Sequence, residues 1–150
     1  MLGFRPTPAS MFEMFSGSPH VEDSHDKYDK VMQIIDMSQM LFKSGDTKRA
    51  IILAEAAIKD AIMMYDYSDK SRALNNISKI LLKNKCTERA IQVAKKAIEV
   101  AEMISNKHEK SKVLSDIINT LLKSGKIDLA LKAANMIPYE DDKSWALSDI

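Results

Sequence analysis

The sequence predicts an all-α fold made of antiparallel helix pairs that repeat about every 40 residues. Apolar side chains recur at helical spacing through most of the chain, and one segment returns at a fixed interval. Only four Gly and four Pro occur among the 150 residues, and most of them lie near the N-terminus. Since strands and tight turns need such residues, the remaining sequence favours helix.

The repeat is carried by three segments that align without a gap. LFKSGDTKRAI begins at Leu41, LLKNKCTERAI at Leu81 and LLKSGKIDLAL at Leu121, which gives a period of 40. A fourth start comes early, because KSKVLSDI from Lys110 returns 33 residues later as KSWALSDI from Lys143. The third unit has therefore lost about seven residues from its second half.

The pattern divides the chain into an N-terminal segment, residues 1–25, and a repeat domain, residues 26–150. Each unit begins with one helix and continues, after a short break, with a second. The expected units span 28–68, 69–108 and 109–141, followed by a partial fourth unit at 142–150. The expected helices cover 27–43, 47–65, 70–83, 87–104, 111–123 and 127–136, with a short last helix from 143.

The breaks and the second helices have features of their own. Gly45, Asn84-Lys85 and Gly125 stand where a residue free to adopt a left-handed conformation can end the first helix. Pro138 fits a stop after the shortened sixth helix. Small residues at spacings of four and three line the second helices, at Ala50, Ala54 and Ala57, and again at Ala90, Ala94 and Ala97. Such residues let two helices approach closely, and neighbouring pairs must stack to bury their apolar sides.

Residues 28–150 resemble tetratricopeptide repeats. Measured from the glycine between the helices, that family places an Ala five residues on and a small residue seven later. The matching residues here are Ala50, Ala90 and Ala130, then Ala57 and Ala97. Ile118 and Ile137 depart from the family's small residues, leucines replace its large aromatic residue, and the first two units lack its terminal Pro. The resemblance implies a right-handed α-solenoid whose first helices line a concave groove.

By alignment, the outward residues of the first helices line that groove. They are Met32, Ile35, Gln39 and Lys43, then Arg72, Asn75, Asn76, Lys79 and Lys83, then Lys112, Ser115, Asp116, Asn119 and Lys123. We expect a partner to bind at Gln39, Arg72, Asn75, Asn76, Lys79, Lys83, Lys112 and Asn119. A basic, amide-rich surface suits an extended peptide with acidic groups or a free carboxylate. For each residue the alternative is an ordinary solvated helix face.

Some members of the family hold a C-terminal carboxylate with two Lys, two Asn and a further base on three first helices. Asn76 and Lys112 fall on two of those five places. Ile35, Gln39 and Asp116 stand at the other three, so the resemblance does not imply a complete clamp here.

The expected function is therefore that of a non-enzymatic scaffold or adaptor that binds a protein or peptide and needs no cofactor. No nucleophile with its base, no Gly-rich phosphate loop and no carboxylate pair can be assembled from the sequence. His20 and His25, five residues apart in an irregular stretch, are poor evidence for a metal site, and none is expected. Cys86 is the only cysteine, which indicates a reducing compartment, with cytoplasm as the expected location.

Composition limits the other kinds of partner. A formal charge of +1 offers little attraction to nucleic acid, and no run of eighteen apolar residues could span a membrane. Three alternatives stay open: a self-assembling structural module that stacks through its ends, a different helical-pair solenoid, and a helical repeat that reads single-stranded RNA. Pentatricopeptide repeats of the last kind share the Gly-to-Ala spacing but have shorter units. A secretion signal of irregular type also stays open.

The two ends of the chain carry apolar residues outside the complete repeats. Ser10 and Glu13 form a possible capping box, which would open a single turn with the apolar residues Met11, Phe12, Met14 and Phe15. We expect this turn to cap the first repeat; the alternative is docking on another molecule. The last residues, with Trp145, Leu147 and Ile150, fall within a fourth first helix. We expect a piece of a longer array; the alternative is a stub that closes the third unit and offers an edge for self-association.

Overall fold

The computed structural model describes residues 20–150, with side chains from Asp26 onward. Within this range the fold is all-helical, as expected, and contains no strand. The helices are α1 His20–Lys43, α2 Thr47–Ile62, α3 Tyr67–Lys83, α4 Thr87–Glu102, α5 Lys107–Lys123, α6 Ile127–Ala134 and α7 Glu140–Asp149. The expected N-terminal cap, Met11 to Phe15, lies outside the described residues.

Helix starts differ most from the sequence prediction. Helix α1 begins at His20 instead of near residue 27, directly after Pro19, a residue type that a helix tolerates only in its first turn. Helices α3 and α5 begin three to four residues early because Asp66 and Asn106 cap them. Each cap accepts a hydrogen bond from the backbone N–H three residues on, at 3.0 Å and 2.9 Å.

The turn inside each pair is the same in all three units. Gly45, Lys85 and Gly125 have φ angles of 88°, 66° and 74°, as the predicted left-handed ends require. The residue after each of them donates its N–H to the carbonyl five residues earlier, at 2.8–2.9 Å. This is the Schellman pattern, which satisfies carbonyls that the end of a helix leaves open. The helix therefore stops at the same place in every unit and sends the chain back antiparallel.

The two helices of a pair approach closely because small side chains line their contact. Alanines at the predicted inner positions of α2 and α4 are almost fully buried. Serines of the first helix also bond across the pair: Ser38 Oγ donates to the Ala50 carbonyl at 2.7 Å, and Ser78 Oγ to the Ala90 carbonyl at 2.9 Å. These bonds recur at the 40-residue interval, so the repeat in sequence is a repeat in hydrogen bonding.

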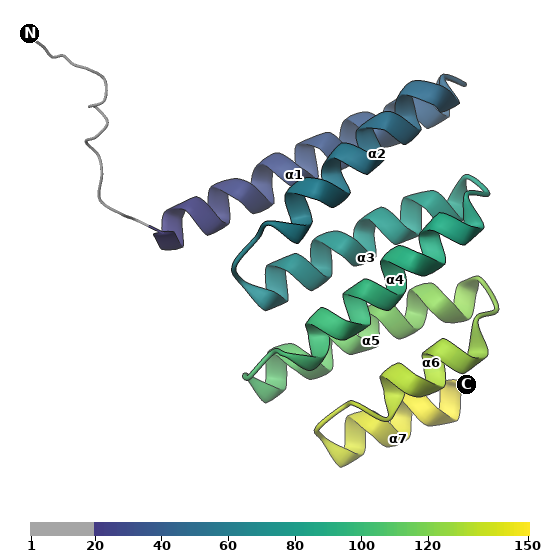
Figure 1. Ribbon diagram of the computed structural model, residues 1–150. Helices are drawn as coiled ribbons and strands as arrows, with labels where there is room; N and C mark the ends of the chain where they lie inside the picture. The colour runs from purple at the N-terminus through teal and green to yellow at the C-terminus, as the bar shows by residue number, and fades with distance from the viewer. Residues whose placement is uncertain (1–19) are drawn as a thin grey trace, which may run out of the picture.

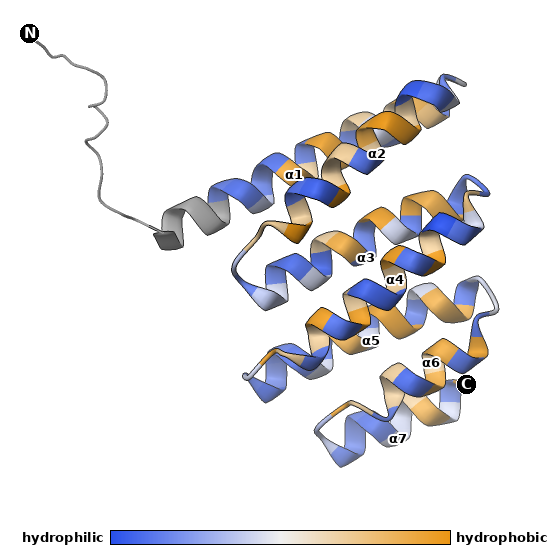
Figure 2. Ribbon diagram, viewed as in Figure 1, coloured by the Kyte–Doolittle hydropathy of each residue, from blue (hydrophilic) through white to orange (hydrophobic). Residues whose placement is uncertain are grey.

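Successive pairs pack side by side in chain order (Figure 1). Helix α3 contacts α1 before it and α5 after it, and α5 contacts α7. Helices α2, α4 and α6 each contact the first helix of the next pair as well as their own partner. Figure 2 shows blue, hydrophilic positions interleaved with orange ones on every helix, as expected when each helix has one solvated side. The apolar core runs through the stack from Val31 to Ile137.

An ion pair joins the second helices of the first two units. Arg89 on α4 donates two hydrogen bonds to the Glu55 carboxylate on α2, at 2.7 and 2.8 Å. The hydrogen bond from Arg89 lowers the pKa of the Glu55 carboxyl below its ordinary value. Such two-pronged contacts fix the angle between groups as well as attracting them.

The third unit is shortened where the sequence predicted, and the loss has a consequence in the core. In the second unit, Ser71 Oγ donates to the Ala97 carbonyl at 2.7 Å. The equivalent serine, Ser111, is buried, and its Oγ has no partner among the described residues. Helix α6 ends at Ala134, so Ile137, which corresponds to Ala97, lies beyond the helix. The missing turn therefore takes away the acceptor that the serine has in the second unit.

Alanine at these two serines should change stability in opposite directions. Ser71→Ala removes a formed bond and should lower the free energy of unfolding by about 1 kcal/mol. Ser111→Ala removes a buried hydroxyl without a partner and should raise the free energy of unfolding by about 1 kcal/mol. Urea denaturation followed by circular dichroism measures both values. Equal losses in the two variants would contradict this account of the shortened unit.

Candidate functional site

A groove runs across the first helices of the three units. One hollow of about 580 Å³ lies between α3 and α5, and a second of about 290 Å³ lies between α1 and α3. Lys79 and Lys83 border both hollows, so the two are continuous along α3. We call this surface the first-helix groove. Its lining is Met32, Ile35, Asp36, Gln39, Asn76, Lys79, Ile80, Leu82, Lys83, Asp116, Asn119, Thr120, Lys123 and Ser124.

The lining repeats with the same 40-residue period as the fold. Four positions of each first helix, spaced by four, three and four residues, point to the same side. These positions are Met32, Asp36, Gln39 and Lys43 on α1, Arg72, Asn76, Lys79 and Lys83 on α3, and Lys112, Asp116, Asn119 and Lys123 on α5. Nine of the twelve line the groove; Lys43, Arg72 and Lys112 do not. The groove is thus one helix face presented three times.

One of the four repeated positions is a lysine in all three units, and helix electrostatics explains why a lysine is favourable there. Lys43, Lys83 and Lys123 each lie in the last turn of a first helix. A cation there interacts favourably with the negative end of the helix dipole, worth roughly 0.3–1 kcal/mol at an exposed site. The row therefore forms because the three helices end side by side, and it brings positive charge to one end of the groove.

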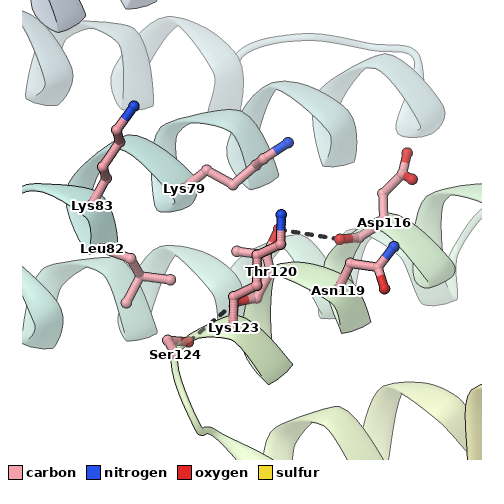
Figure 3. A pocket seen from close by; sticks show the side chains of 8 residues that line it. All are labelled: Lys79, Leu82, Lys83, Asp116, Asn119, Thr120, Lys123 and Ser124. Carbon is pink, nitrogen blue, oxygen red and sulfur yellow. Dashed lines mark hydrogen bonds between the residues drawn. The ribbon is translucent and has the colours of Figure 1, made fainter. Parts of the chain in front are cut away.

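The charges of the groove have no partners among the described residues. Lys79, Lys83 and Lys123 are exposed, and no ion pair within residues 26–150 involves them. Figure 3 shows the side chains of α3 and α5 that border the larger hollow, with Thr120 Oγ1 bonded to the Asp116 carbonyl at 3.1 Å. Lys79 projects from α3, and Asp116 and Asn119 from α5. Three ammonium groups and several amides are therefore free to meet a ligand.

Five of the eight expected binding residues line the groove. They are Gln39, Asn76, Lys79, Lys83 and Asn119. Asn76 Nδ2 lies 3.5 Å from Met32 Sδ, a weak contact that leaves the amide oxygen available. Lys112 is exposed on α5 but does not border either hollow.

Asn75 and Arg72 differ from the expectation. Asn75 is only 4% exposed, so its side chain belongs to the core and not to the binding surface. Arg72 is held by Asp69 at 3.2 Å and Glu109 at 3.6 Å, and it borders a separate hollow beside the loops between units. Burial raises the pKa of the neighbouring Tyr28 hydroxyl above its ordinary value, and Arg72 partly opposes this shift. Arg72 therefore links α3 to α5 through Glu109 and does not face the groove.

Five residues that line the groove were not expected there: Asp36, Ile80, Leu82, Thr120 and Ser124. For Asp36 the signal was present: it lies 40 residues before Asn76, which was assigned to the groove. Its neighbour Ile35, which was assigned to the groove instead, is 3% exposed and borders the smaller hollow. Ile80, Leu82, Thr120 and Ser124 flank the repeated positions, and no pattern in the sequence separates them from the core.

The C-terminal residues expected to dock are on the surface. Helix α7 has no buried residue, and the Trp145 side chain is 73% exposed. Leu147 is also exposed, and Ile150 packs partly against the core.

Comparison with protein-family models, with curated proteins and with solved structures finds no match for the chain. Within the described residues, no group of three or more His, Cys, Asp or Glu side chains is arranged to hold a metal ion. None of the described helices combines the length and the apolar character needed to cross a membrane.

Proposed function

We propose that this chain is a tetratricopeptide-like, right-handed α-solenoid that binds an acidic, extended peptide segment of a protein partner in the first-helix groove. The observation that carries the proposal is the set of Lys79, Lys83 and Lys123, which border the groove without an ion pair among the described residues. The proposed activity is non-enzymatic and needs no cofactor, and the single Cys86 favours a reducing, cytoplasmic setting.

The chemistry of the groove suits such a ligand in two ways. Lysines supply point charges to carboxylates, either of side chains or of a C-terminus. Gln39, Asn76 and Asn119 can donate to and accept from a peptide backbone without demanding a particular sequence. Asp36 and Asp116 border the two hollows as well and would repel acidic groups placed beside them. The favoured ligand therefore carries its charge toward the lysine row.

Charge reversal in the groove tests the proposal. The triple variant Lys79→Glu, Lys83→Glu, Lys123→Glu should bind a fluorescein-labelled peptide of alternating Glu and Ala roughly tenfold or more weakly, because it loses charge-assisted hydrogen bonds. Fluorescence anisotropy measures the Kd for the intact chain. Affinity for the peptide should also fall as salt is added, since these charges are exposed.

The second helices offer a matched control. Lys59 and Lys132 lie in the last turns of α2 and α6, as Lys83 and Lys123 do in α3 and α5, and Lys95 is an exposed lysine of α4. Lys59→Glu, Lys95→Glu, Lys132→Glu therefore makes the same change in net charge and costs similar helix-end stability. Equal loss of affinity in both triple variants would remove the groove from the proposal and leave only a general charge effect.

Self-assembly through the C-terminal end is a second candidate, favoured by the exposed Trp145 of α7. Light scattering over a range of concentrations decides it, and a strict monomer rules it out. Binding of single-stranded RNA has less support, because no aromatic side chain lines either hollow of the groove and bases need such platforms for stacking. If the chain bound a labelled RNA strand in a salt-sensitive way and did not bind the acidic peptide, RNA binding would replace peptide binding as the proposed function.

A further inference from the structure

Equivalent positions of the first helices differ sharply in exposure. Ile77 on α3 and Ile117 on α5 are 1% and 0% exposed, whereas Met37, at the same position of α1, is 53% exposed. Met40 is 69% exposed, whereas Ile80, its equivalent on α3, is 8% exposed. The helix faces are the same, so the difference lies in what covers them.

The cover on α3 and α5 is the preceding helix pair. Helix α3 packs against α1 and α2, and α5 packs against α3 and α4. No described helix precedes α1 (Figure 1). Two large apolar side chains of α1, Met37 and Met40, are consequently exposed, and two others on the same face, Ile34 and Leu41, are only partly buried against the core. We call them the α1 outer stripe: Ile34, Met37, Met40 and Leu41.

We propose that the apolar N-terminal residues of the same chain dock along α1, with Met11, Phe12 and Met14 on the α1 outer stripe and Phe15 beside Lys30. They would cover the face of α1 that a preceding helix pair covers on α3 and α5. Four large apolar residues within a stretch of five cannot form a core of their own. The α1 outer stripe is also incompletely covered, whereas the equivalent side chains of α3 and α5 are buried. Contact between the two would remove apolar surface of both from water.

The length of the connecting chain permits this contact. Met37 lies seventeen residues into α1 from His20, or about 26 Å along the axis at 1.5 Å per residue. Met11 lies nine residues before His20, and an extended chain of that length spans up to about 30 Å. Met11 and Phe12 thus reach Met37 when residues 11–19 run back along α1 as an extended chain, in place of the helical turn expected at Met11 to Phe15. Phe15, at five residues and about 17 Å, reaches the helix only near Lys30.

The charges of the two segments also favour an antiparallel course of the N-terminal residues along α1. Lys30 lies one turn before Ile34 on the face of the outer stripe and is exposed, whereas its equivalents Lys70 and Lys110 are partly covered. Glu13 stands in the middle of the apolar residues of the N-terminal segment. A segment that runs antiparallel to α1 brings this carboxylate within reach of the Lys30 ammonium while Phe12 and Met11 lie further along the helix.

The proposed occupant also has the advantage of its tether. A segment joined by a few residues acts at an effective concentration that reaches the millimolar range, so weak apolar contacts suffice. Two of the stripe residues are methionines, which adapt to irregular surfaces and make favourable contacts with aromatic rings. A second copy of the chain would lack the tether and would have to bury the same stripe from solution.

Disulfide trapping in the full chain tests the contact. The starting variant is Cys86→Ser, Phe12→Cys, to which Met37→Cys is added. Docking brings these two cysteines within the separation that a disulfide needs, so mild oxidation should give an intramolecular cross-link. The control replaces Met37→Cys with Met32→Cys, which lies closer to His20 but borders the first-helix groove. We expect the Met37 cross-link to form at least tenfold faster.

The two outcomes that would overturn the proposal are distinct. Faster cross-linking at Met32 is the result for a tether that does not dock, because that position is nearer to the attachment point. Cross-linked dimers whose yield rises with protein concentration would show that a second copy covers the stripe. Met37 is largely exposed, so its replacement leaves the fold intact. Non-reducing gel electrophoresis separates the cross-linked monomer, the uncross-linked monomer and the dimer, and reduction of a parallel sample shows that the links are disulfides.

Discussion

Replacing Ile77 with alanine should lower the free energy of unfolding by roughly 2–5 kcal/mol, the range for large core residues. Ile77 is 1% exposed in the middle of α3, the helix that contacts α1 and α2 on one side and α4 and α5 on the others. A cavity there removes contacts within the pair and between pairs together. The effect should therefore be large even though one side chain is shortened by three carbons.

Urea denaturation of the full chain measures this loss. The matched control is Ile52→Ala on α2, where the same side chain is 64% exposed. Its effect should stay within about 0.5 kcal/mol, as for most surface substitutions. If both variants lost the same stability, the side-by-side packing of helix pairs would be wrong, because burial of Ile77 depends on it.

Replacing Ala97 with leucine should destabilise the chain by about 1–3 kcal/mol or more, since it adds three carbons to a tightly packed contact. Ala97 is fully buried, and its carbonyl accepts the Ser71 hydroxyl across the α3–α4 pair at 2.7 Å. A bond of that length cannot persist if the helices move apart to admit a larger side chain. Overpacking and loss of the bond therefore act together.

The control for Ala97→Leu is Lys96→Leu, one residue earlier on the exposed side of α4. Both changes add a leucine to the same helix, and both residue types are good helix formers. Thermal unfolding should show a much lower Tm for Ala97→Leu and a nearly unchanged Tm for Lys96→Leu. Similar melting temperatures would mean that the small inner face does not set the distance between the helices.

The helix pairs could be predicted from the sequence because periodicity and turn residues agree. The left-handed positions were correct at Gly45 and Gly125, and also at Lys85, where no glycine marks the turn. The starts of α2, α4 and α6 were correct, and a buried alanine lies in the first turn of each. The starts of α3 and α5 were less accurate because their first turns carry no buried residue. Asp66 and Asn106 set those starts through side-chain caps, which apolar periodicity alone does not reveal.

The candidate site could be predicted correctly only at positions that were aligned with the 40-residue repeat. Lys79, Lys83 and Asn119 line the groove as expected. Asn75 does not, because it lies one position from the outward face and packs into the core in spite of its polarity. An amide is typical of a surface, and only the packing of neighbouring helices shows that this one is enclosed.

Exposure at the ends of the stack depends on neighbours and not on residue type. Met37 and Ile77 are both large and apolar and occupy the same position of two aligned helices, but only Ile77 has a preceding described helix pair packed against its helix. The same holds for Ser71 and Ser111, whose hydrogen bonding differs because α6 is shorter than α4. Such differences arise from tertiary structure, so a repeat in sequence predicts the scaffold better than the state of each side chain.

The most direct test of the proposed function is a map of backbone amide chemical shifts in the intact chain as the Glu-Ala peptide is added. The account predicts that the largest changes cluster on the first helices, around Gln39, Lys79 and Asn119, and that they diminish as salt is raised. Changes confined to α7 or to the second helices, or no change at peptide concentrations that saturate the anisotropy signal, would contradict it.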